Sequence, residues 1–348
     1  MRKIRVVQIG IGHDHATGIL DTVLKQQDIY DVCALGVPES EKTDFCERLK
    51  NYENKLPIVT VDEALNLKDI DAVIVETEEE NLTKYAYAAA KKGLPVHMDK
   101  PGGLKLNEFE KLINAAKENK SVLHLGYMYR YNPAINEAIK KARSGEIGEI
   151  YAVEAQMNCE HGREKREWLA RFRGGMMFFL GCHLIDLIVR IQGFPEEVIP
   201  LNRPTQIGGT TAEDYGFAVL KYKNGISFAK TCAAEPGGYS RRQLVICGSE
   251  GTIEMKPLES FDENGDIYTQ TAEVNKKKAD VDWCYRAPIV SSKPYGRYDY
   301  MMSDFCKMVC GDLENPFDYD YELKLYKTLL KACGVRQGEI KNESNTYK

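Results

Sequence analysis

A lysine stands at the end of a short apolar run in the first third of the chain. The run at 96–98 is followed by Asp99, Lys100, Pro101 and two glycines. Pro101 cannot donate a hydrogen bond to a continuing strand, and the glycines permit a sharp change of direction, so we expect a buried strand that stops here. A lysine at such a strand end can donate or accept a proton when its surroundings lower its pKa. A solvated Asp-Lys pair in a surface turn is the alternative that this spacing leaves open.

Two glycines near the N-terminus form a second candidate site. The β-rich run 4–9 leads into Gly10, Ile11 and Gly12, and a helical stretch follows at about 16–26. A strand, a glycine turn and a helix in this order can hold a dinucleotide. The first glycine makes the turn, and the second lets the backbone approach a pyrophosphate at the helix N-terminus.

Two histidines follow these glycines. His13 and His15 lie between the turn and the helix, and His15 stands where the usual fingerprint has its third glycine. They could contact the phosphates of a cofactor or reach an active cleft. Residues that start the helix are the simpler interpretation, and both interpretations stay open on the sequence.

The elements that must position these residues alternate between strands and helices. Further β-rich runs lie at 32–35, 58–60, 71–77 and 121–127, with helical stretches between them. This alternation predicts an α/β fold with a doubly wound parallel sheet over 1–125. Glu39 is the acid nearest to the end of the second strand and no arginine adjoins it, which favours NAD over NADP without deciding between them.

The pattern changes after residue 150. Runs of strand character lie at 151–157, 215–222, 226–233 and 243–247. They follow one another largely without crossover helices, which predicts an open, mainly antiparallel sheet in an α+β domain over 126–336. We expect helices at 301–311 and 321–335 to pack back on the first domain, and 337–348 to form a polar tail.

A mostly apolar stretch at 173–186 carries His183 and Asp186. Their spacing puts them on one face of a predicted helix. A histidine on an apolar helix is more often a core residue than a catalyst. The preceding loop carries Glu160 and His161, which could lie in a cleft, although a solvent-exposed polar loop is the simpler interpretation.

Composition restricts the kind of partner. The 348 residues are 43% hydrophobic and 28% charged, and the formal net charge of −5 argues against a nucleic acid as the main partner. No apolar run approaches the roughly 20 residues of a membrane-spanning helix. The ten cysteines show neither a CxxC pair nor metal-ligand spacing. We therefore expect reduced cysteines, no metal site and a cytoplasmic protein.

Taken together, these motifs resemble the Gfo/Idh/MocA oxidoreductase family over most of the chain. The resemblance rests on Gly10-Ile11-Gly12, the strand ending at Thr77, the stretch 93–101 with its Asp-Lys-Pro, and the segments 126–134 and 144–150. It implies an N-terminal Rossmann domain, a C-terminal domain whose sheet forms a homodimer or homotetramer, and a small sugar-like substrate. The cofactor-binding residues that it implies are Gly10, Ile11, Gly12, His13, His15, Glu39, Thr77, Asp99 and Lys100.

The resemblance also implies the catalytic residues, with one departure from the family pattern. Lys100 and His183 match the catalytic lysine and histidine, and the substrate-binding candidates are Tyr129, Glu160, His161 and Asp186. Polyol dehydrogenases of the family have an acid four residues before the histidine, where this chain has Phe179. An inositol-type reaction therefore lacks one of its side chains here, and Glu160 or His161 could replace it.

These observations predict a nicotinamide-dependent oxidoreductase that moves a hydride between NAD(P) and a hydroxyl of a sugar, sugar derivative or cyclitol. One alternative is an NAD-dependent glycosidase or glycoside-modifying enzyme that oxidises a hydroxyl transiently and then eliminates a leaving group. A second alternative is a non-catalytic regulator that senses a dinucleotide or a sugar. Phe179 favours the regulator, whereas the presence of both Lys100 and His183 argues against it.

Overall fold

The computed structural model describes residues 2–282 and 284–336, and the chain divides into two compact units. Among the described residues, the first unit holds those up to Met128 together with Tyr298–Tyr326, and the second holds Tyr129–Arg297 and residues 327–336. The segment 298–326, which the sequence analysis assigns to the second domain with helices that pack back on the first, clusters with the first unit. The tail expected at 337–348 lies outside the described residues.

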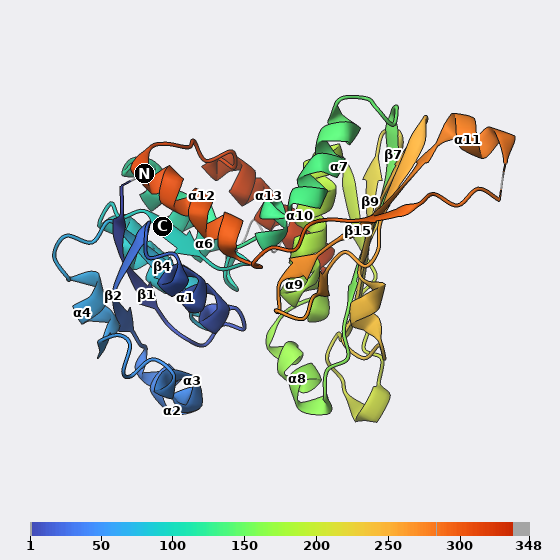
Figure 1. Cartoon of the computed structure of the whole chain (residues 1–348). Coiled ribbons are helices and arrows are strands. Elements are labelled where there is room, and N and C mark those ends of the chain that lie inside the picture. The colour runs from blue at the N-terminus through green and yellow to red at the C-terminus, as the bar shows by residue number, and fades with distance from the viewer. Residues whose placement is uncertain (1, 283, 337–348) are drawn as a thin grey trace. The chain divides into compact units, whose positions relative to one another are not determined.

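A parallel sheet forms the centre of the first unit (Figure 1). Its strands are β1 (Ile4–Ile9), β2 (Tyr30–Gly36), β3 (Ile58–Val59), β4 (Ala72–Val75), β5 (Val96–Met98) and β6 (Leu123–Leu125). Within the described residues the strand order is β3-β2-β1-β4-β5-β6, and all neighbouring pairs are parallel. This is the doubly wound order that the sequence predicts. The order reverses between β1 and β4, and ligands of such sheets bind at the carboxyl ends of the strands near that point.

Helices connect these strands. They are α1 (Ala16–Lys25), α2 (Glu39–Asp44), α3 (Cys46–Lys50), α4 (Val61–Leu65), α5 (Leu82–Lys91) and α6 (Leu106–Glu118). Later in the chain, α12 (Asp299–Cys310) and the part of α13 (Tyr319–Ala332) up to Tyr326 also belong to this unit. Their apolar residues recur at helical spacing, as in α6, which buries Leu106, Phe109 and Ile113. Helix α12 lies beside α1 (Figure 1). In the part of the chain that is described, no helix combines the length and the apolar character needed to cross a membrane.

The second unit contains a mixed, mainly antiparallel sheet. Its strands are β7 (Ile150–Asn158), β8 (Glu197–Pro200), β9 (Tyr215–Tyr222), β10 (Gly225–Cys232), β11 (Gln243–Gly248), β12 (Gly251–Met255), β15 (Gln270–Asn275) and β16 (Ile289–Ser291), with a separate small hairpin of β13 (Ser260–Phe261) and β14 (Ile267–Tyr268). The order is β16-β15-β12-β11-β7-β10-β9-β8. Among the pairs described, β7 with β10 is parallel and the others are antiparallel.

Helix α10 covers one face of this sheet by packing on β7 and β10. The helices of the unit are α7 (Pro133–Arg143), α8 (Arg163–Trp168), α9 (Met176–Phe179), α10 (Gly181–Gln192) and α11 (Lys276–Val281), with 3₁₀ turns at Met128–Tyr131, Leu169–Arg171, Ile207–Gly209 and Gly238–Arg241. The single helix expected over 173–186 is thus two helices that are interrupted at Leu180. Phe179 and His183 lie on different helices as a result.

The turn after β1 depends on a glycine. Gly10 has φ +88°, and a Cβ atom there would lie 2.7 Å from Thr77 Cα and 2.4 Å from Thr77 Cγ2. Gly145 has a similar φ of +80°, but a Cβ atom there would meet nothing within 4 Å. The two glycines therefore separate the cost of the backbone conformation from the cost of a steric clash.

We predict that Gly145→Ala lowers the free energy of unfolding by about 1 kcal/mol, which is the conformational cost alone. Gly10→Ala should lower it by at least about 2 kcal/mol more, because the backbone of the neighbouring strand must move. Urea denaturation followed by circular dichroism measures both values. Equal losses in the two variants would contradict the close approach of Thr77 to the turn.

Candidate functional site

The glycine turn of the first unit already binds an oxyanion, the side chain of Glu41. The backbone N–H groups of Ile11 and Gly12 donate to Glu41 Oε2 at 2.7 and 2.9 Å, and the N–H of Glu78 donates to Oε1 at 3.1 Å. Glu41 is fully buried, and this burial raises the pKa of its carboxyl group. Arg48 closes the other side of the turn, since its guanidinium donates to the carbonyl oxygen of Ile11 at 2.9 Å.

This geometry fits the phosphates of a dinucleotide. Two adjacent N–H groups at the end of β1 point at one acceptor oxygen, as they do at a phosphate. A Cβ atom on Gly12 would lie 2.9 Å from the Glu41 carboxyl carbon and from Glu78 Cγ, so a larger residue there would displace these two side chains. The pyrophosphate of a cofactor and the Glu41 carboxylate would compete for the same donors. Glu41 must therefore move for the cofactor to bind there.

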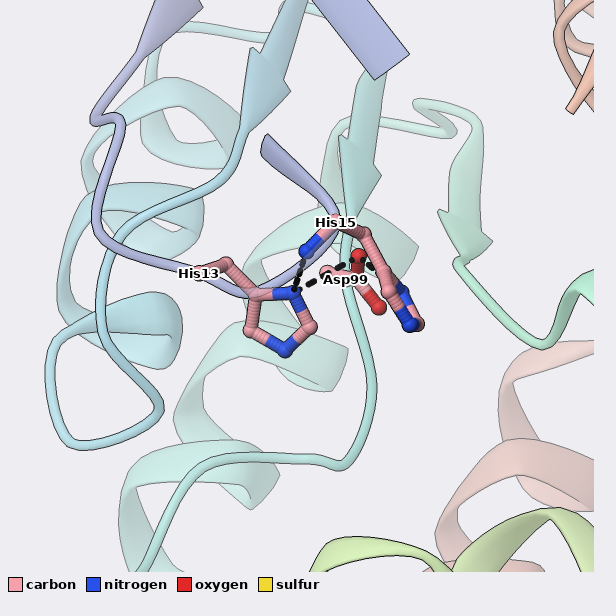
Figure 2. A group of neighbouring side chains, drawn as sticks. All are labelled: His13, His15 and Asp99. Carbon is pink, nitrogen blue, oxygen red and sulfur yellow. Dashed lines mark hydrogen bonds and ion pairs between the residues drawn. The ribbon is translucent and has the colours of Figure 1, made fainter. Parts of the chain in front are cut away.

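Next to this turn lies a cluster of His13, His15 and Asp99 (Figure 2). Nδ1 of His13 and Nδ1 of His15 each lie 3.0 Å from Oδ2 of Asp99. His15 is the N-cap of α1, but its side chain contacts Asp99 instead of capping the helix. The histidines are therefore more than helix-start residues, because they join the glycine turn to the end of β5.

Burial shifts the pKa values in this cluster. It lowers the pKa of His15 to about 4. Burial alone would raise the pKa of Asp99, but the charges and hydrogen bonds of His13 and His15 hold it well below its usual range. In Glu76, at the end of β4, burial and then the charge of Asp99 raise the pKa well above its usual range.

A second pair of histidines continues this cluster into the core of the sheet. Nε2 of His97 lies 3.4 Å from Oε1 of Glu76, and Nδ1 of His97 lies 2.7 Å from Nδ1 of His124. The ring of His124 stacks on Phe305 of α12. Burial lowers the pKa of His97 to about 4, so His97 is neutral at pH 7, and both buried rings belong to the core.

Lys100 follows β5 directly. Its exposed fraction is 2%, and its backbone N–H donates to Asp99 Oδ1 at 2.6 Å. A solvated Asp-Lys pair in a surface turn is therefore wrong, since both residues are buried. Thr77 is also buried and lies against the glycine turn.

Glu39, the acid that the sequence analysis selects near the end of the second strand, does not contact the glycine turn in the free chain. Glu39 starts α2 with a side chain that is 87% exposed and forms an ion pair with Lys42 at 2.9 Å. The acid that reaches the glycine turn is Glu41, two residues later. A single sequence gives no signal for it, because helix α2 is short and shows no clear apolar face.

The second unit holds His183 in a buried position on α10. The ring of His183 lies edge-on to the ring of Tyr129, with the centroids 5.1 Å apart. The hydroxyl of Tyr129 donates to Glu259, which also forms ion pairs with Arg242 at 3.2 Å and Arg297 at 2.7 Å. Tyr129 thus belongs to a buried charged network beside His183.

The other candidates in this unit are arranged differently. Asp186 accepts from Arg130 at 2.8 Å, and both side chains are 1% exposed, so the carboxylate neutralises a buried guanidinium. Glu160 is exposed, and the N–H of His161 donates to the carbonyl oxygen of Ala233 at 2.8 Å. The loop is thus paired to the segment that follows β10.

Phe179 lies in an aromatic cluster. Its ring lies edge-on to Trp168 at 5.3 Å, and the ammonium group of Lys165 lies 3.6 Å from the centre of the Trp168 ring and 4.8 Å from that of Phe179. At the position where the family resemblance implies an acid, this chain therefore has an aromatic ring that packs against Trp168 and lies near the Lys165 ammonium group.

Comparison with known protein families agrees with this architecture. A model described as an oxidoreductase family with an NAD-binding Rossmann fold matches residues 4–127, and a model of the GFO/IDH/MocA C-terminal domain matches residues 135–254. The chain belongs to the Gfo/Idh/MocA oxidoreductase family. This confirms the resemblance drawn from its motifs, and the cofactor of the family fold is NAD(P).

Individual relatives are distant. The chain is 24% identical over 277 residues to a 2,7-anhydro-N-acetylneuraminate hydratase from Mediterraneibacter gnavus. This alignment covers 73% of this chain and 71% of that protein. It is 25% identical to scyllo-inositol 2-dehydrogenase (NAD(+)) from Bacillus subtilis, over 56% of this chain and 58% of that protein. The structure of aldose-aldose oxidoreductase from Caulobacter crescentus is similar in fold, with a TM-score of 0.74, 18% identity and coverage of 96% of this chain and 98% of that chain.

We predict that Glu41→Gln tightens the binding of NAD at least about fivefold, or about 1 kcal/mol, because the variant removes a charged competitor from the phosphate donors. Isothermal titration calorimetry with NAD measures the dissociation constant. Glu39→Gln, on the same helix but exposed, is the matched control and should leave the constant unchanged. Weaker binding in Glu41→Gln would show instead that this carboxylate is a ligand of the cofactor.

Proposed function

We propose that this protein is a dehydrogenase that moves a hydride between NAD(P) and a hydroxyl group of a sugar, sugar derivative or cyclitol. The observation that carries the proposal is the buried Lys100 at the end of β5, in the same unit as a glycine turn that binds an oxyanion. The scyllo-inositol dehydrogenase among the relatives supports the same class of substrate.

The proposed roles follow from the chemistry of each residue. The nicotinamide ring supplies the hydride chemistry when the cofactor is bound. The N–H groups of Ile11 and Gly12 bind its phosphates, and Lys100 donates a hydrogen bond to the cofactor ribose or to the substrate hydroxyl. His183 exchanges the hydroxyl proton. Asp99 holds the backbone of Lys100 through its Oδ1 atom, so it is a positioning residue.

A second candidate is an enzyme that oxidises a hydroxyl transiently and eliminates a leaving group. Two observations favour it. The hydratase from Mediterraneibacter gnavus aligns with 73% of this chain, and Phe179 replaces the acid expected of a polyol dehydrogenase. In this reaction the cofactor returns to its starting state, so product forms without a net change in NADH.

We predict that Lys100→Met lowers kcat by about 10²–10³, since a positioned hydrogen-bond donor at the reacting group contributes about that much in rate. The assay follows both NADH and product over a panel of polyols, sugars and glycosides. Lys105→Met, an exposed lysine that pairs with Glu108, is the control and should keep full activity.

The same assay separates the alternatives. Net NADH formation with product supports the dehydrogenase, and product without net NADH supports the transient oxidation. A wild-type protein that binds NAD but converts none of the panel would overturn both and favour a non-catalytic regulator.

The proposal includes self-association through the sheet of the second unit, in the cytoplasm. Along β9 and β10, alternate residues are buried, while Phe217 and Phe228 stack at 5.5 Å on the other face and remain half-buried. Ile226 and Tyr151 on neighbouring strands are 58% and 49% exposed. An apolar face of this kind suits contact with a second copy of the chain.

A further inference from the structure

The cluster beside the glycine turn has the donor set of a metal site. One nitrogen of His13, one nitrogen of His15 and one oxygen of Asp99 all lie within 4.8 Å of one another, and Figure 2 shows the three side chains converging. His13 and Asp99 are buried, and the His15 side chain is 13% exposed. Three separate segments of chain, the turn, the start of α1 and the end of β5, are therefore joined through these atoms.

The distances are close to those of a coordinated ion. The ligand atoms of a tetrahedral zinc, with bonds of about 2.0–2.2 Å, lie about 3.3 Å from one another. Asp99 Oδ2 lies 3.0 Å from both Nδ1 atoms, and the three ligand atoms all lie within 4.8 Å of one another. An ion would therefore enter with a shift of the two imidazole rings around Asp99. Coordination through Nδ1 of His13 would replace the 3.2 Å hydrogen bond that this atom accepts from the N–H of His15.

The surroundings supply the outer groups that metal sites use. Nε2 of His13 faces Oε1 of Glu79 at 3.6 Å, which is the arrangement in which a carboxylate orients a metal-bound histidine through its other nitrogen. Asp99 Oδ1 accepts from the N–H of Lys100, which fixes the carboxylate and leaves Oδ2 toward the histidines. His13 and Asp99 thus each have a second contact that orients the side chain.

An independent observation comes from Glu76. Its carboxylate is fully buried, and neither oxygen has a hydrogen-bond partner among the described residues. Oε2 lies 3.9 Å from Nδ1 of His13. A buried carboxylate without donors is costly unless a proton or a cation compensates it. Glu79 and Asp99 also lie within 4 Å of His13, so three acidic side chains surround one buried imidazole.

We infer that His13, His15 and Asp99 bind a divalent transition-metal ion of the zinc type, with Glu76 beside the fourth position. Two imidazoles with carboxylates suit Zn²⁺ and its first-row neighbours better than Mg²⁺ or Ca²⁺, which prefer oxygen ligands. The ion would tie the glycine turn to the end of β5 and would offset the acids next to the phosphate donors. Metal loading should therefore stabilise the first unit and tighten the binding of NAD. The site goes beyond the proposed dehydrogenase function and does not depend on it.

The test uses the full chain, stripped with a chelator and then titrated with Zn²⁺. We expect elemental mass spectrometry to find one Zn²⁺ per chain. Loading should raise the melting temperature of the protein and lower the dissociation constant for NAD in calorimetry. His15→Ala and Asp99→Asn should weaken Zn²⁺ binding by more than about 100-fold, and Glu79→Gln, which acts on His13 from the outer shell, by about 10–100-fold. His161→Ala removes a histidine outside the cluster and should bind Zn²⁺ like the wild type.

Crystals of the wild-type protein soaked in Zn²⁺ make the test independent of how the variants fold. An anomalous peak between His13, His15 and Asp99 supports the site. The absence of a peak there, or Zn²⁺ binding that is equal in His15→Ala and in the wild type, overturns it. A wild-type chain that takes up no Zn²⁺ would also overturn the site. It would indicate that a proton shared between Glu76 and Asp99 compensates the buried carboxylates instead.

Discussion

Buried negative charge at the carboxyl edge of the parallel sheet is the constraint on which the first unit depends. Glu41, Glu76 and Asp99 all lie at this edge with almost no exposure to solvent. A buried charge that loses its partner costs several kcal/mol, so each carboxylate needs its own compensation. Backbone N–H groups compensate Glu41, and two histidines compensate Asp99. The glycine turn, the start of α1 and the end of β5 are held together by this requirement.

The fold of the first unit could be predicted from the sequence because its signals are local. Strands that alternate with helices of similar length fix a doubly wound sheet, and the glycines after β1 mark the turn without reference to any distant residue. The placement of Lys100 at a strand end was predicted for the same reason. Whether that lysine is buried or solvated could not be decided locally, because its burial depends on the packing of the whole sheet edge.

The contacts of the site could not be predicted, because they join segments that are distant in sequence. His15 and Asp99 are 84 residues apart, and Glu41 is 30 residues from the N–H of Ile11. Nothing in a single sequence gives the direction of these side chains. The break at Leu180 was missed for another reason. The apolar pattern runs on through it, so periodicity predicts one helix where the backbone forms two.

The turn that binds Glu41 has a consequence for how the protein uses its cofactor. The N–H groups proposed to bind the phosphates are already hydrogen-bonded to Glu41, so a phosphate that took Glu41's place would not require the turn to unfold. When a dinucleotide leaves, the carboxylate can take back both N–H groups. Such an internal substitute would keep the turn fully hydrogen-bonded whether or not a phosphate group occupies it.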